Sequence, residues 1–202
     1  MQVPSIQIAE QILQHGTERN PTRWSGHSRV AAHCAAAIAH LCSDMDEDAA
    51  YVMGLLHDIG RQEGNTDMKH IIDGYRFMLS EGYADSARIC LTHSFPLQDI
   101  RAYGGKNDCT EEETRFIGRF LESVEYNDYD RLIQLCDALA FPDRPVCVEK
   151  RLVDVTLRKG FNDFTIAKWK AFLELKTYFD KKCAVDIDEL LQTGGRYLGI
   201  SG

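Results

Sequence analysis

The sequence predicts an all-α fold. Apolar residues recur with a period near 3.6 along most of the 202 residues, which is the spacing that gathers them on one face of a helix. No stretch of five or more residues shows the alternating, β-branched pattern of a strand. Glycine and proline are few, and several of them fall where a periodic segment stops. We therefore expect one helix to follow another along the whole chain.

The periodic segments divide the chain into ten predicted helices. In order, they span residues 5–15, 22–42, 46–60, 68–80, 84–93, 110–125, 128–140, 145–159, 165–182 and 186–193.

Local signals set the limits of the first three helices. Gly16 ends the first, and the pair Pro21-Thr22 opens the second, whose many alanines allow close helix packing. Asp46 lies at the start of the third helix, where a carboxylate is favoured by the helix dipole, and Gly60 is expected to stop it.

The fourth and fifth helices are predicted from their periodicity alone, and clearer signals return later. Thr110 and Glu113 have the spacing of a capping box at the start of the sixth helix. Pro142 and Pro145 separate the seventh helix from the eighth. Residues 94–109 are the longest irregular stretch, and we expect them to form a lid or lip over a site.

Composition narrows the class of protein. The net charge of −8 at pH 7 disfavours general binding to nucleic acid, because the surface repels phosphate backbones. Seven cysteines without a C-x-x-C pair suit a reducing cytosol. The N-terminus has no signal-peptide pattern and no apolar run reaches 18 residues, so we expect a cytoplasmic protein without a membrane partner. The length fits a single domain over residues 1–202.

Histidines and aspartates inside apolar segments are the candidate site residues. His57 and Asp58 follow an apolar helical run, and burying an imidazole and a carboxylate there is costly unless a charged group receives them. Asp137 lies in another apolar run, and His27 comes early in the alanine-rich helix. Imidazole and carboxylate together are suitable ligands for first-row divalent metals.

The order of these residues resembles the H…HD…D signature of the HD-domain phosphohydrolase superfamily. The segments that carry the resemblance are His-Ser-Arg-Val-Ala at 27–31, Leu-Leu-His-Asp-Ile-Gly at 55–60 and Leu-Cys-Asp-Ala-Leu-Ala at 135–140. The resemblance covers about residues 22–141, and the second segment is its most specific part. Family members often have Lys after the glycine, where this chain has Arg61. The resemblance implies a compact HD-domain helical bundle, with residues 145–195 as an additional helical extension.

Two further histidines make the chain similar to the dinuclear members of that superfamily. In those proteins a His-x-x-x-Gly helix start and a later histidine commonly supply a second metal, which the aspartate of the HD pair bridges. The resemblance implies one ion on His27, His57, Asp58 and Asp137, and another on Asp58, His70 and His93. Fe, Mn, Zn, Co and Ni all suit such ligands.

The implied activity is that of a metal-dependent phosphohydrolase, which attacks a small nucleotide or related phosphate ester with a metal-activated water. Asp58, Arg61 and Lys69 are the expected catalytic residues, since Arg61 and Lys69 lie close in sequence to the ligands and anion binding needs directed positive donors. No serine or cysteine stands in a triad or elbow setting, and no P-loop is present.

Two other functions stay open. Some HD-fold proteins with the same six ligands bind two irons and use O₂ to cleave C–C or C–P bonds. Others are non-catalytic modules for sensing or scaffolding, although these generally lose ligands that this chain retains.

The aromatic and aliphatic side chains between residues 161 and 179 have two possible uses. We expect them to pack back on the bundle, and the alternative is a homodimer interface, because aromatic residues are enriched in both settings.

Overall fold

The computed structural model describes residues 1–193, and over this range the fold is all-α as predicted. Residues 194–202, which include the last two residues of the predicted extension, lie outside the described residues. The elements are α1 (Ile6–Arg19), α2 (Trp24–Ala39), α3 (Glu47–Leu56), η1 (Ile59–Glu63), α4 (Lys69–Ser80), α5 (Ala84–Thr92), η2 (Ile100–Ala102), α6 (Glu111–Ser123), α7 (Asp128–Ala138), α8 (Val148–Lys159), α9 (Thr165–Cys183) and α10 (Ile187–Thr193), where η1 and η2 are short 3₁₀ helices.

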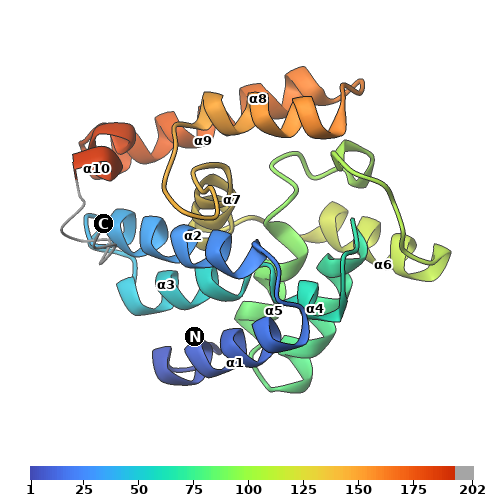
Figure 1. Cartoon of the computed structure of the whole chain (residues 1–202). Helices are drawn as coiled ribbons and strands as arrows, with labels where there is room; N and C mark the ends of the chain where they lie inside the picture. The colour runs from blue at the N-terminus through green and yellow to red at the C-terminus, as the bar shows by residue number, and fades with distance from the viewer. Residues whose placement is uncertain (194–202) are drawn as a thin grey trace.

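The helices pack as a bundle with the C-terminal helices laid along one side. Helix α2 packs along α3 and also contacts α7, while α4 packs against α5 and η1. Helix α1 lies against α3 and η1 on the far side from α8 and α9, which run across the top of the view in Figure 1. Among residues 1–193, no helix has both the length and the apolar character that crossing a membrane requires.

The largest apolar cluster joins the bundle to the C-terminal helices. Phe172 and Phe179 of α9 are buried in it together with residues of α2 and α7. The prediction that C-terminal aromatic residues pack back on the bundle is therefore confirmed for these two. Phe161, at the turn before α9, is 72% exposed instead. A homodimer through such exposed side chains stays a prediction.

Two predicted helix ends are wrong. Helix α3 ends at Leu56 rather than at Gly60, because the chain turns at His57 and Asp58 and continues as the 3₁₀ helix η1. Helix α1 continues through Gly16 to Arg19. A Cβ on Gly16 would lie 3.0 Å from the Ile59 Cδ1. This glycine therefore allows α1 to pack closely against Ile59 and does not terminate the helix.

Gly60 allows η1 to touch the backbone of α4. A Cβ at this position would lie 2.0 Å from the carbonyl oxygen of His70 and 2.4 Å from the backbone nitrogen of Gly74. The glycine is thus required by the approach of two backbones, and its φ is outside the left-handed region. This contact brings Asp58, just before η1, next to His70 on α4.

We predict that Gly60→Ala destabilises the protein by about 1–3 kcal/mol, because the added methyl forces η1 away from α4. Urea unfolding measures the change. Gly118→Ala is the matched control, since the atom nearest to a Cβ there, Ile100 Cγ2, lies 3.9 Å away. It should be neutral or stabilise α6 by up to about 1 kcal/mol. Equal stability of the two variants would contradict the packing role of Gly60.

The predicted capping box at the start of α6 is confirmed. The Thr110 hydroxyl accepts a hydrogen bond from the Glu113 N–H, and the Glu113 carboxylate accepts one from the Thr110 N–H. The same carboxylate accepts hydrogen bonds from Arg76 and Lys69. Burial opposes its ionisation, but these donors outweigh burial and lower the pKa of Glu113 to about 2.

Because that pKa is depressed in the folded state, Glu113 stabilises the fold above its ordinary pKa near 4.5, and the contribution is lost as the pH falls toward 2. We predict that Glu113→Gln costs about 1–3 kcal/mol at pH 7. The difference from wild type should shrink by pH 3. Urea midpoints of both proteins at the two pH values measure it, and a difference that does not change with pH would be inconsistent with this carboxylate's charge as the cause.

Candidate metal centre

Four buried histidines lie at the ends of four helices around one point. His27 lies in the first turn of α2, and His70 is the second residue of α4. His57 and His93 end α3 and α5. None of the four is more than 6% exposed. Helix ends are suitable positions for a shared site, because the adjacent loops leave room for side chains from different helices to converge.

Each of these imidazoles has its Nδ1 fixed by a backbone carbonyl. The acceptors are Ala140 at 3.0 Å for His27, Gly54 at 2.7 Å for His57, Asp67 for His70, and Cys90 at 3.0 Å for His93. A carbonyl oxygen only accepts, so Nδ1 carries the proton in all four rings. The Nε2 atoms are therefore unprotonated in the neutral rings, as in histidines that ligate a metal.

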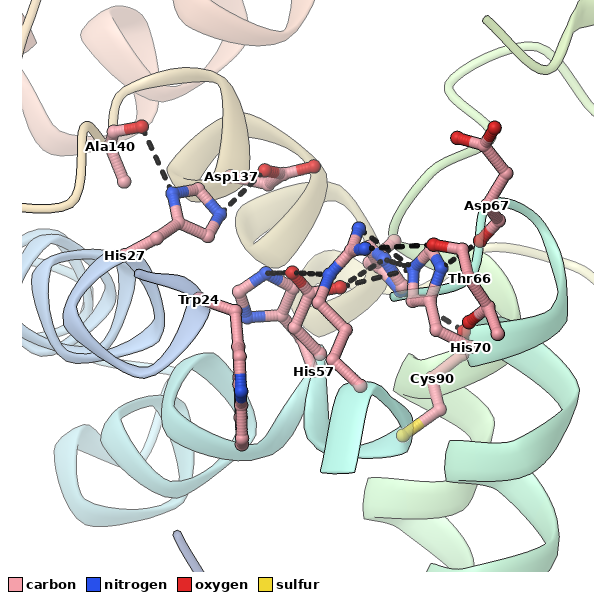
Figure 2. A network of polar contacts seen from close by, with 12 residues as sticks. Trp24, His27, His57, Thr66, Asp67, His70, Cys90, Asp137 and Ala140 are labelled. Atoms are coloured by element: carbon pink, nitrogen blue, oxygen red, sulfur yellow. Dashed lines mark hydrogen bonds and ion pairs between the residues drawn. The ribbon is translucent and has the colours of Figure 1, made fainter. Parts of the chain in front are cut away.

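These Nε2 atoms face carboxylate oxygens at short distances. His27 Nε2 lies 2.9 Å from Asp137 Oδ1, and His70 Nε2 lies 3.0 Å from Asp58 Oδ1. Figure 2 shows His27 between the Ala140 carbonyl and the Asp137 carboxylate. With the protons on Nδ1, both partners in each pair are acceptors. Such a pair is repulsive unless a cation lies between them or a proton is added.

Three overlapping sets of ligand atoms lie within 4.8 Å of one another. They are His27–His57–Asp58, His57–His93–Asp137 and Asp58–His70–His93. The last is the set predicted for the second ion. The four residues predicted for the first ion are divided between the other two sets, which share His57. The structure thus brings all six predicted ligands into one cluster, which we call the His/Asp cluster.

Two polar atoms at the centre of the cluster have no hydrogen-bond partner among residues 1–193. They are His57 Nε2 and Asp58 Oδ1, and both are buried. An unsatisfied buried polar atom costs about 1–3 kcal/mol, so these positions favour a bound cation. Burial lowers the pKa of His57 to about 4, against the opposing charge of Asp58, so that its Nε2 lone pair is available at neutral pH.

Arg61 is held against Asp58. Its Nε donates to Asp58 Oδ2 at 2.6 Å, and a terminal nitrogen lies 3.4 Å from His70 Nε2. Burial opposes ionisation of Asp58, but Arg61 and then His70 and His57 outweigh it and hold the pKa of this carboxyl well below its usual range. Asp58 is therefore an anion, with one oxygen on Arg61 and the other facing the histidines.

Lys69 is not brought to the cluster. Its ammonium lies 3.1 Å from Glu113 and 3.7 Å from Asp73. It does not line either cavity beside the cluster. Lys69 and His70 are neighbours on α4 and so point about 100° apart, which sends one toward α6 and the other toward Asp58.

Two cavities adjoin the cluster. The first, of about 190 Å³, is the α8–α9 cavity, lined by Asp58, His93 and Asp137 of the cluster and by Leu152, Trp169 and Phe172 of α8 and α9. The second, of about 610 Å³, is the polar cavity, lined by His27 and Asp58 and by Arg23, Arg144, Arg158 and Lys159. Arg61, Tyr103, Arg151, Arg158 and Lys159 line both. Tyr103 belongs to the irregular stretch 94–109, which we expected to form a lip.

Arg151 is a residue that the sequence reasoning missed. It lies on α8, beyond the resembling region, with its guanidinium 3.5 Å from Asp137. No motif marks it. Only the packing of α8 against α7 places it beside the cluster.

Comparison with protein families gives the class of the chain. The HD domain model matches residues 24–141, which is more than half of the 202 residues, and the chain belongs to the HD domain family. Comparison with curated proteins and with solved structures gave no match. HD domain proteins bind divalent metals, and the cluster has the groups to hold one.

We predict that protein purified without chelator retains divalent metal and that His57→Gln loses most of it, because His57 belongs to two of the three ligand sets. Elemental analysis of both proteins measures this. His40→Gln is the control, since the His40 side chain is exposed and forms a hydrogen bond with Glu47. Chelation should also lower the melting temperature of the wild type, since a bound metal stabilises the folded state. Full metal retention by His57→Gln would rule out its role as a ligand.

Proposed function

We propose that the protein is a metal-dependent phosphohydrolase that uses two divalent ions, held by the six residues of the cluster, to hydrolyse a small nucleotide or related phosphate ester. The observation that carries the proposal is the convergence of four histidine Nε2 atoms and two carboxylates, next to cavities lined by arginines. Membership in the HD domain family supports it.

Ions held there would neutralise charge on phosphate oxygens and lower the pKa of a water toward neutrality. The chain's own residues bind and orient the ester. Arg61 and Arg151 line both cavities and present guanidinium donors to an anion beside the ligands. Burial raises the pKa of Tyr103, so its phenol stays protonated and is a further donor.

Cys90 is poorly suited to act as a covalent nucleophile. Cys90 is the cysteine whose thiol lies near Asp58, and burial followed by the Asp58 charge raises its pKa. Its thiol donates to the Leu56 carbonyl at 3.6 Å. A thiol held in its protonated form is a weak nucleophile. This supports direct attack by water.

A cytoplasmic location forms part of the proposal. All seven cysteines are free, as in proteins of a reducing compartment. A small phosphorylated metabolite would be the partner of such an enzyme.

Phosphate release from a panel of nucleotides and simpler phosphate esters, with Mn²⁺ or Fe²⁺ supplied, tests the proposal. We predict that Asp58→Ala lowers the rate at least about 10³-fold and loses metal, because Asp58 joins two ligand sets. Asp163→Ala, at an exposed position before α9, should keep wild-type activity. A metal-free Asp58→Ala protein that still releases phosphate at the wild-type rate would refute the assignment.

The same panel run without oxygen separates hydrolysis from the di-iron oxygenase chemistry that the ligands also allow. A hydrolase releases phosphate at the same rate under argon. Activity that requires O₂ and consumes it would instead favour the oxygenase.

A further inference from the structure

One part of the α8–α9 cavity wall is apolar and suits an organic group. Leu152 and Phe172 are buried in its wall, and Val155 and Trp169 are partly buried there. These side chains come from α8 and α9, outside the region that the HD domain model matches. Aromatic residues in an apolar wall favour a flat ring, which they contact by stacking or edge-to-face packing.

Lys168 places a cation of α9 beside this apolar part of the wall, in addition to Arg61, Arg151, Arg158 and Lys159, which also line the cavity. Its side chain lines the cavity, and its Nζ lies 3.7 Å from where a Cβ on Gly104 would stand. Within residues 1–193, the structure gives its ammonium no hydrogen bond and no ion pair. By contrast, Lys159, which lines the same cavity, is paired with Asp67 at 2.5 Å, and Lys176 of the same helix is paired with Asp180 at 2.9 Å. An unpaired, partly buried ammonium is costly, so an oxygen acceptor from a ligand would stabilise it.

The protonation state of Lys168 allows its ammonium to donate a hydrogen bond. Burial lowers the pKa of its ammonium to about 8, with the Asp137 charge acting in the opposite direction. It is therefore mostly protonated at neutral pH. Its ammonium lines the cavity and has no hydrogen-bond or ion-pair partner among the described residues, so a ligand in the cavity is placed to supply one.

Arg151 connects this cavity with the position of the phosphate. Its guanidinium lies 3.5 Å from Asp137 and 3.6 Å from Asp154, and neither contact is a hydrogen bond by distance and geometry. Its donors are thus available to an anion at the junction of the two cavities.

We infer that the α8–α9 cavity binds the organic group of the substrate, a flat and largely apolar ring with a carbonyl oxygen that accepts a hydrogen bond from Lys168. An oxo-substituted nucleobase has this chemistry. The inference rests on the proposed function, since it takes the phosphate to lie between Arg151 and the cluster.

Binding of phosphonates, which a hydrolase does not cleave, tests this without relying on turnover. Calorimetric titration of the metal-loaded protein under argon uses three probes: methylphosphonate, benzylphosphonate and 4-acetylbenzylphosphonate. They share the anionic group and add first a ring and then a carbonyl. We expect the ring to tighten binding about tenfold and the carbonyl to add about another tenfold.

Variants show which residues are responsible for these gains in affinity. Lys168→Met should weaken the acetyl probe about tenfold and leave benzylphosphonate within twofold, while Lys168→Arg restores part of the loss. Lys170→Met, exposed on the same helix, is the matched control and should change nothing. Val155→Trp should fill the space beside the apolar wall. It should weaken the binding of both ring probes without affecting that of methylphosphonate. Circular dichroism and melting temperatures confirm that each variant is folded.

Equal affinity of the three probes for wild-type protein would overturn the inference. So would an equal loss of all three in Lys168→Met, because that would place the ammonium at the phosphate. The result also separates the two proposals. Ring-selective binding without hydrolysis of any ester would refute the proposed activity alone, whereas hydrolysis without ring selectivity would refute the cavity's role alone.

Discussion

The structure depends on a cluster in which hydrogen-bond acceptors face one another. Backbone carbonyls fix the Nδ1–H of four histidines, so their Nε2 lone pairs point inward at each other and at two carboxylates. Such an arrangement is unfavourable in isolation, and burial makes it more so. His57 Nε2 and Asp58 Oδ1 lack any partner among the described residues. A fold that keeps this arrangement gains stability when cations occupy it, and this links folding to metal binding.

The bundle serves to hold these helix ends in place. Four ligands come from the ends of α2, α3, α4 and α5, and small residues let those helices approach closely. A Cβ on Gly54 of α3 would lie 2.7 Å from the Ala32 Cα of α2, and Gly60 has the same relation to α4. Both glycines flank the His57–Asp58 turn. Positional accuracy at the site therefore comes from backbone contacts, which vary less than contacts between long side chains.

The C-terminal helices lie outside the region that the HD domain model matches. The matched region ends at residue 141, yet α8 and α9 share the largest apolar cluster with the bundle and form one wall of a cavity at the metal ligands. Under the proposed function, the metal ligands and the residues that recognise the substrate thus come from different parts of this chain. Arg151 and Lys168 are the clearest examples, because they approach Asp137 only through the packing of α8 and α9 on α7.

By itself the sequence determined the helical fold and the capping box at Thr110, because periodicity and capping are properties of local spacing. The six residues that meet in the cluster were predicted from the resemblance to HD-domain proteins. The sequence did not determine where α3 ends, since the turn at His57 and the role of Gly60 depend on contact with α4. Lys69 and Arg151 show the same limit of prediction from the sequence at the site. Lys69 is next to a ligand in sequence but pairs with Glu113, whereas Arg151 is distant in sequence but lies beside Asp137. Only tertiary structure decides such cases, because the direction of a side chain on a helix and the neighbour that it meets are set by how helices far apart in the chain pack together.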